Sequence, residues 1–129
     1  MSFTPAEQDF LGAQPIGRLS TIGPGGQPQI RPVGVHLGPD GTVDIVGHAL
    51  ASTQKWRNVI ANPKVAFIVD EVTSVVPPQA QGIEVRGTAQ ALAGEGSTDG
   101  GLSGDIIRLT PTRIISWGID GEGTRARNA

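Results

Sequence analysis

Cysteine and tyrosine are absent from this 129-residue chain, and three phenylalanines and two tryptophans are its only aromatic residues. Without cysteine the chain has no disulfide framework, no thiolate nucleophile and no cysteine-based metal site. So few aromatic rings argue against a stacking platform for nucleic-acid bases. Charge of one sign is also lacking, because 10 basic and 12 acidic residues are mixed along the chain for a net charge of -2. A nucleic-acid partner is therefore not expected.

Long hydrophobic runs are missing as well. No apolar segment approaches the roughly 20 residues that a membrane-spanning helix needs. The opening residues, MSFTPAE, lack the basic and then apolar pattern of a signal peptide. The two histidines, His36 and His48, are twelve residues apart and on different faces, so they do not form the ligand pattern of a metal site. These absences predict a soluble, cytoplasmic protein of one domain, residues 1–129, with no membrane partner and no metal.

Glycine and proline are abundant, at 19 and 10 residues, and they separate short apolar runs. This spacing is typical of antiparallel β proteins. A capping box at Thr4 and Glu7 predicts a short N-terminal helix that ends near Gly12. Alternation and turn residues predict strands at 16–22, 28–37, 42–47, 64–70 and 83–92, and two consecutive strands within 105–119.

The expected strands are joined mainly as hairpins, with one helix that crosses between two of them. Closing such a small sheet into a barrel removes its exposed edges. We therefore predict a mainly β fold, a closed or nearly closed barrel of about six to seven antiparallel strands. Residues 71–81 and 94–104 are expected to be loops, the second of them flexible, and residues 121–129 a disordered tail.

The crossover helix is expected to follow the strand at 42–47. Ser52 or Thr53 is a natural N-cap, which predicts a helix from there to Ala61. The spacing of the apolar residues predicts that one stripe of this helix is buried. That stripe consists of Trp56, Val59 and Ile60.

Lys55 falls in the first turn of this helix, where a cation is unfavourable unless an anion lies nearby. Unpaired N–H groups, the hydroxyls of Ser52 and Thr53 and the ammonium group would meet at the helix start. This arrangement favours a phosphate. Two other interpretations stay open here, a solvated lysine and hydroxyls that only cap the helix.

Other candidate residues also have two interpretations. Arg31 precedes Pro32, which cannot donate to a sheet and so indicates an edge strand or a ligand-facing irregularity. A solvent-facing arginine is the alternative. His48 ends its strand just before the helix, where a polar cap is the expected role. Trp117 lies in the final strand, where a place in the core or at a dimer interface is expected.

Several short stretches resemble one known family in their order and spacing. They are IGRLSTI, GQPQIRPV, KWRN, NPKVA and GIEVRG, which begin at residues 16, 26, 55, 62 and 82. They are similar to segments of the split-barrel flavin-binding proteins related to pyridoxamine 5'-phosphate oxidase. The PTRIISWGI stretch at residues 111–119 resembles the F420-dependent subgroup. The resemblance extends from Pro15 to Ile119.

This resemblance implies an FMN-binding split β-barrel with Greek-key-like topology and a homodimer with cofactor sites at the interface. It also implies F420 or FMN as the redox cofactor. The residues implied for the tricyclic ring lie on the second strand and are Arg31, Pro32 and Val33. Those implied for the phosphate end are Gly47, His48, Ser52, Thr53 and Lys55, with Trp117 as a contact to the partner's cofactor.

The chain also departs from the family pattern. Residues 75–81 lack the tryptophan and arginine expected from the subgroup, and residues 94–104 replace a shorter connection. The basic and histidine residues that bind substrate in the true oxidases are not evident near the C-terminus, so the oxidase reaction itself is not expected.

The leading hypothesis is an oxidoreductase that passes a hydride between its cofactor and a small, planar, electron-poor acceptor. F420 is preferred to FMN because of the subgroup resemblance alone. A non-catalytic cofactor carrier and a barrel used only for protein association are the alternatives.

Overall fold

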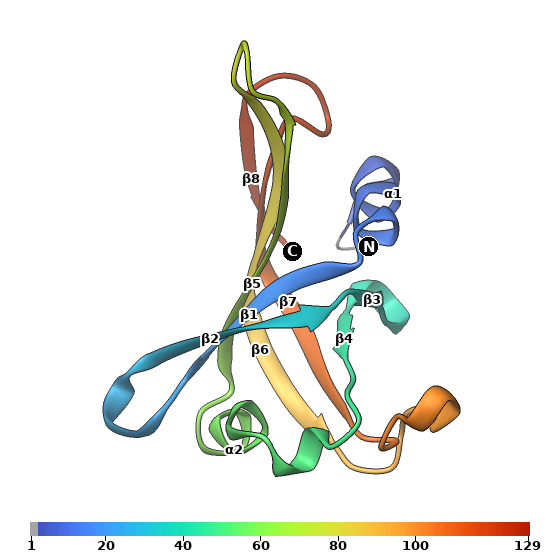
Figure 1. The fold of residues 1–129 in the computed structure, drawn as a ribbon. Helices are drawn as coiled ribbons and strands as arrows, with labels where there is room; N and C mark the ends of the chain where they lie inside the picture. Colours follow the sequence, from blue (N-terminus) through green and yellow to red (C-terminus); the bar gives the residue numbers. More distant parts are fainter. Residues whose placement is uncertain (1–2) are drawn as a thin grey trace.

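A computed structural model describes residues 3–129 of the chain (Figure 1). Within this range eight strands form one antiparallel sheet in the order β2-β1-β5-β6-β7-β4-β3, with β8 paired to β7. The strands are β1 Ile16–Ile22, β2 Pro28–Gly34, β3 His36–Leu37, β4 Val43–Ile45, β5 Lys64–Ser74, β6 Gln79–Leu92, β7 Ile106–Trp117 and β8 Thr124–Asn128. The helices are α1 (Pro5–Ala13) and α2 (Gln54–Ala61). The mainly β fold is confirmed, with more strands than expected.

The sheet is curled because its two edge strands follow each other directly in the chain. β2 and β3 stand at opposite ends of the strand order, yet only Val35 separates them. The Val35 amide donates to the Pro15 carbonyl at the start of β1, at 3.3 Å. The strand expected at 28–37 is therefore two strands, which bend around a common interior to give a half-barrel (Figure 1).

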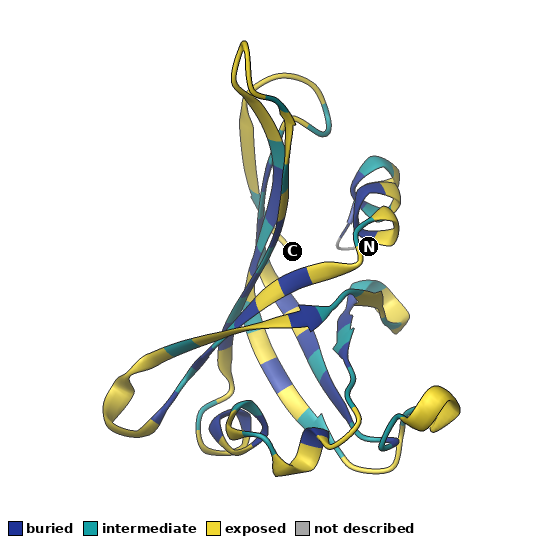
Figure 2. Ribbon diagram, in the orientation of Figure 1, coloured by how far each residue is buried: buried dark blue, intermediate teal, exposed yellow. Residues whose placement is uncertain are grey.

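Buried residues alternate with more exposed ones along the strands (Figure 2), and the buried apolar side chains form one core. Val65, Phe67 and Val69 of β5 are buried, and the residues between them are only partly buried. Ile83 and Val85 of β6 are also fully buried, as the predicted alternation requires. Neither helix in residues 3–129 has the length and apolar character needed to cross a membrane.

Helix α1 begins with the predicted capping box. The Glu7 amide donates to Thr4 Oγ1 at 3.2 Å, and the Thr4 amide donates to Glu7 Oε1 at 2.9 Å. Glu7 is fully buried and also binds Arg127 of β8, with N–O distances of 3.0 and 2.5 Å. Burial raises the pKa of Glu7, but the Arg127 guanidinium and the Thr4 amide together hold it below its ordinary value. These bonds join the first helix to the last strand.

The C-terminal segment 121–129, which we expected to be disordered, contains β8. Its backbone pairs with β7 over a register that runs from Trp117 opposite Thr124 to Arg113 opposite Asn128. The side chains of β8 are mostly exposed, so apolar alternation does not mark it. Backbone pairing and the Arg127 ion pair order this segment instead.

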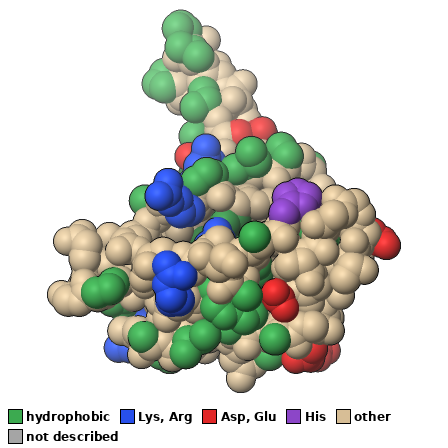
Figure 3. Space-filling view, turned by 60° about the horizontal axis from the view of Figure 1, so that its bottom comes forward, with side chains coloured by type: hydrophobic (Ala, Val, Ile, Leu, Met, Phe, Trp, Pro, Cys, Tyr) green, Lys and Arg blue, Asp and Glu red, His purple; other side chains and the backbone are tan. Residues whose placement is uncertain are grey.

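Residues 71–81, expected to be a loop, are largely strand. β5 continues to Ser74 and β6 begins at Gln79, and together they form a long hairpin that stands out from the body (Figures 1 and 3). Pairs such as Val72 opposite Ala80 continue the ladder beyond the barrel. The tip carries exposed apolar side chains, with Val76 89% exposed.

The segment at 105–119 forms one strand, β7, where two were expected. Pro111 lies opposite Gly87, next to a shift in the β6–β7 register between Arg86 and Gly87. Such a bulge accommodates a residue that has no N–H to donate. The two backbones approach closely here, because a Cβ on Gly87 would lie 2.1 Å from the Thr110 carbonyl oxygen.

Helix α2 ends at Ala61 as predicted, but its buried face differs from the expected stripe. Trp56 and Val59 are buried, whereas Ile60 is 67% exposed. Asn58 is buried instead, because its side chain makes hydrogen bonds to β1 and β2. These bonds set the rotation of the helix about its own axis and turn Ile60 outward.

Candidate functional site

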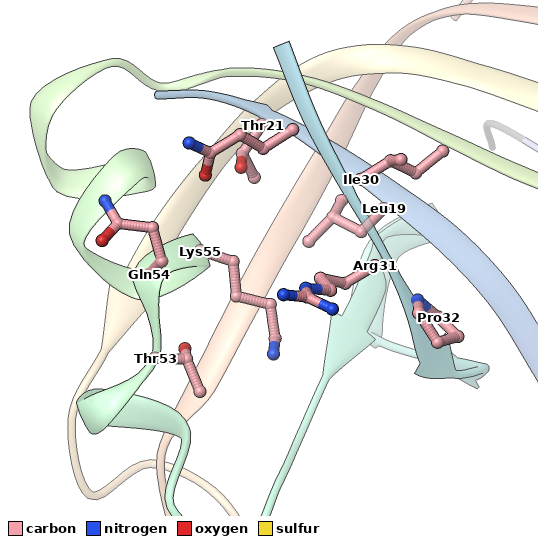
Figure 4. Close-up of a pocket in the computed structure, with 9 residues that line it drawn as sticks. Leu19, Thr21, Ile30, Arg31, Pro32, Thr53, Gln54 and Lys55 are labelled. Carbon is pink, nitrogen blue, oxygen red and sulfur yellow. The ribbon is translucent and has the colours of Figure 1, made fainter. Parts of the chain in front are cut away.

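A cavity of about 780 Å³ opens between β2 and the first turn of α2 (Figure 4). This volume lies within the usual range of small-molecule sites, roughly 300–1,000 Å³. Strand β1 forms its floor beside β2, because Leu19 pairs with Arg31 and Thr21 pairs with Gln29. The lining residues are Leu19, Thr21, Gln29, Ile30, Arg31, Pro32, Thr53, Gln54 and Lys55.

Arg31 and Lys55 extend into this cavity toward each other, one from β2 and one from α2 (Figure 4). Within residues 3–129 neither cation has a carboxylate partner. Burial, and after it repulsion from Arg31, lower the pKa of Lys55 below its ordinary value. Two like charges in a partly buried site destabilise each other unless an anion lies between them.

Thr53 is the N-cap of α2 and so fixes where the helix begins. Its hydroxyl donates to the Leu50 carbonyl at 2.6 Å and accepts from the Trp56 amide at 3.4 Å. The amides of Gln54 and Lys55 fall in the first turn, where no helical carbonyl precedes them. They add to the positive potential of the two cations at the same end of the helix.

A hydrogen-bond network centred on the buried side chain of Asn58 connects three residues that line the cavity. Asn58 Nδ2 donates to Thr21 Oγ1 at 2.9 Å and to Gln29 Oε1 at 2.8 Å. Asn58 Oδ1 accepts from Gln54 Nε2 at 2.7 Å. Asn58 is not among the residues predicted from the sequence, although its position one turn after Lys55 places the two near each other on the helix.

The family model described as pyridoxamine 5'-phosphate oxidase matches residues 3–118. The chain belongs to this family. A relative from Streptomyces rimosus subsp. rimosus, named 5a,11a-dehydrotetracycline/5a,11a-dehydrooxytetracycline reductase, is 38% identical over 133 residues. The match covers 99% of this chain and 94% of that protein.

Solved structures of the pyridoxamine 5'-phosphate oxidase type share the fold. A conserved hypothetical protein of Mycobacterium tuberculosis gives a TM-score of 0.69 at 21% identity, over 89% of this chain and 84% of that one. A structure described as an F420 reductase gives a TM-score of 0.63 at 21% identity, over 82% and 94%. The expected split β-barrel is therefore confirmed.

Membership in the pyridoxamine 5'-phosphate oxidase family, together with the reductase relative, identifies the chain as an oxidoreductase of this fold. Members of the family bind flavins. Proteins of this fold are also often dimeric.

The structure brings together four of the nine residues that the family resemblance implied. Val33 is 7% exposed and belongs to the core. Ser52 is exposed at the end of a short 3-10 turn, η3 (Leu50–Ser52), and its carbonyl accepts from Arg57. The four residues that line the cavity are Arg31, Pro32, Thr53 and Lys55.

Gly47 and His48 contact the 94–104 loop and do not line the cavity. The Gly47 carbonyl accepts from the Ser103 amide at 2.9 Å. His48 Nδ1 lies 2.9 Å from the Gly101 carbonyl oxygen, to which it donates. The loop that we expected to be a flexible connector is thus attached to the segment that leads into α2.

Trp117 is the last residue of β7 and lies at the other end of this strand from the segment that pairs with β4. It packs on Gly82, where a Cβ would lie 2.3 Å from the indole ring. It is outside the cavity of its own chain, and its contact with a partner's cofactor stays a prediction. Among residues 3–129 no three histidine or acidic side chains gather as a metal site would need.

Proposed function

We propose that this chain is a reductase that holds the phosphate of F420, or alternatively of FMN, between Arg31 and Lys55. The observation that carries the proposal is the pair of cations in one cavity at a helix start. The described residues that line this cavity include no acidic side chain. F420 ranks before FMN because of the subgroup resemblance at residues 111–119, and a structure of this fold is described as an F420 reductase.

Each lining group has a distinct role toward the phosphate. The Arg31 guanidinium can donate to two oxygens at once, and the Lys55 ammonium adds a compact charge. The first-turn amides lie at the positive end of the α2 dipole. Ile30 and Pro32 give β2 an apolar edge along which a ring could lie, and Pro32 has no N–H left to satisfy. The cofactor supplies the hydride chemistry when bound, and the chain positions it.

The substrate that we propose is a small, planar, conjugated and electron-poor molecule. The 38%-identical relative is named as a reductase of a dehydrotetracycline, a fused-ring compound with an additional double bond. Reduction of such a bond adds a hydride to one carbon and a proton to its neighbour. The described lining residues include no acid and no histidine, so water would supply the proton.

A second copy of the chain is proposed to complete the site as a homodimer. Ile30 is 61% exposed beside the cavity. It also borders a shallow hollow on the other side of the sheet, together with Ala66 and Ile68. A partner packed on this surface would cover Ile30 and provide a second wall opposite β2.

Binding followed by turnover tests the proposed function. The protein is titrated with F420 and with FMN, and binding is read from the change in cofactor fluorescence. Reduced F420 is then mixed with the protein and a panel of quinones and conjugated enones. Binding with oxidation of the reduced cofactor supports a reductase. Binding without oxidation across the panel supports the cofactor carrier, which the lack of acid–base groups in the cavity favours. Failure to bind either cofactor excludes both.

A further inference from the structure

Asn58 connects the two elements that carry the cations. It lies on α2, one turn after Lys55, and its amide donates to Thr21 of β1 and Gln29 of β2. Gln29 and Arg31 are two positions apart on β2, so their side chains lie on the same face of the strand. A single side chain therefore joins the helical turn of Lys55 to the strand of Arg31.

The carboxamide of Asn58 makes three hydrogen bonds here. Both Nδ2 hydrogens are donated, and Oδ1 accepts from Gln54. Because Asn58 is only 2% exposed, loss of a partner would leave a buried polar group unsatisfied. Aspartate cannot donate and leucine cannot form these bonds, so neither isostere replaces the amide.

Arg31 and Lys55 repel each other, and Arg31 is the only other charged residue among the described lining residues. On the helix itself, Arg57 is exposed and donates to the Ser52 carbonyl and to Gln54. The buried side chains of Trp56 and Val59 anchor the helix in the core, and the hydrogen bond from Asn58 to Gln29 joins it directly to β2.

We propose that Asn58 is the positioning residue that holds Lys55 close to Arg31 before any ligand binds. The inference rests on the proposed function for the identity of the anion, but the charge pair that it concerns exists in the empty protein. Preorganisation of this kind lowers the free-energy cost of bringing both cations to one phosphate.

The lysine content of the chain makes a direct test possible, because Lys55 and Lys64 are its only lysines. Protein labelled with carbon-13 lysine gives two signals, and the pH titration of the Lys55 signal reports its pKa. Asn58→Leu is expected to raise the pKa of Lys55 toward its ordinary value, since the ammonium moves away from Arg31 into water. The signal of Lys64, on β5, serves as the internal reference.

Two further variants complete the test. Gln29→Met removes one of the two acceptors of the Asn58 amide and should also raise the pKa of Lys55. Because Gln29 is partly exposed, this variant can replace Asn58→Leu if the latter does not fold. Asn62→Leu makes the matched substitution at the opposite end of α2 and should leave the pKa of Lys55 unchanged. A Lys55 pKa that stays low when the Asn58 bonds are removed overturns the inference.

Cofactor affinity gives a second readout. Asn58→Leu is expected to raise the Kd for F420 and FMN by roughly five- to tenfold, and Asn62→Leu to leave it unchanged. If the wild-type protein binds neither cofactor, the proposed function is wrong. The Lys55 titration would still test the positioning role of Asn58, so failure of the proposed function and failure of this inference are distinguishable.

Discussion

Arg31 and Lys55 repel each other in the cavity, and a bound anion would relieve this repulsion. Lys55 is partly buried, so water screens its charge less than at an open surface. An acidic neighbour would have stabilised them within the fold, yet residues 3–129 place none beside them. The phosphate binding that we propose would account for the placement of these two residues, which folding stability does not.

Lys55→Ala is expected to weaken binding of F420 or FMN by about 1.5–3 kcal/mol, because it removes a charge-assisted hydrogen bond to phosphate. The empty protein should lose no stability, since Arg31 then has no like charge beside it. Calorimetric titration and urea unfolding measure the two effects. Lys64→Ala is the control and should bind normally. Equal Kd values for Lys55→Ala and the wild type would exclude Lys55 from the site.

Local residue patterns pointed to part of the candidate site. Lys55 and Thr53 could be found because capping and the helix dipole act within a few residues of the helix start. Asn58 could not, because its partners Thr21 and Gln29 are 37 and 29 positions away and meet it only through the sheet. The same holds for His48, which bonds a carbonyl 53 positions further on.

Elements with local signals were predicted closely, and elements held only by backbone pairing were not. β1 and α2 have the predicted bounds because burial alternation and caps mark them. The outer part of the β5–β6 hairpin and all of β8 have few buried residues, so no periodicity reveals them. The break expected at Pro111 is a bulge, which depends on Gly87 in a different strand.

The 94–104 loop is expected to loosen when His48 is replaced. His48→Ala removes the donor to the Gly101 carbonyl, so the neighbouring bond from the Ser103 amide to Gly47 should open more often. Amide exchange measured by NMR is expected to quicken several-fold at Ser103. The Gly96 amide, which bonds to Gly104 within the loop, is the internal control and should keep its rate. Unchanged exchange at Ser103 would show that the loop is held without His48.

At the scale of the whole molecule, the ion pair between buried Glu7 and partly exposed Arg127 joins α1, the first helix, to β8, the last strand. The folded-state pKa of Glu7 lies below its ordinary value of 4.5. Between the folded-state pKa and the ordinary value, Glu7 therefore binds a proton more readily in the unfolded chain than in the folded one. The contribution to stability is fully present above pH 4.5 and is lost as the pH falls through the folded-state pKa.

Glu7→Gln is expected to lower the free energy of unfolding by about 2 kcal/mol at neutral pH, because hydrogen bonds to a charged group are lost. The deficit relative to the wild type should shrink as the pH falls below 4.5, the ordinary value for Glu7. Urea unfolding at a series of pH values measures the deficit in unfolding free energy and its dependence on pH. Asp9→Asn makes the same change in charge at an exposed position of α1 and should have little effect. If the loss of unfolding free energy in Glu7→Gln does not depend on pH, the packing of the Glu7 side chain stabilises the fold and its charge does not.

Association of two chains decides whether the proposed site is complete. Ile30 and Ile60 are similarly exposed, at 61% and 67%, but Ile30 borders the cavity and Ile60 faces outward from α2. Ile30→Asp is expected to give monomers and to weaken F420 or FMN binding by about tenfold or more, because a charge would be buried in the interface. Ile60→Asp should leave both properties unchanged.

Sedimentation equilibrium with and without cofactor distinguishes the possible outcomes. A dimeric Ile30→Asp protein with wild-type affinity would place the interface on another surface. A wild-type protein that stays monomeric while it binds F420 would show that one chain is sufficient. If Ile30→Asp loses affinity only to the extent that it loses the dimer, the second chain supplies a wall of the site, because β2 exposes its apolar edge in a single copy.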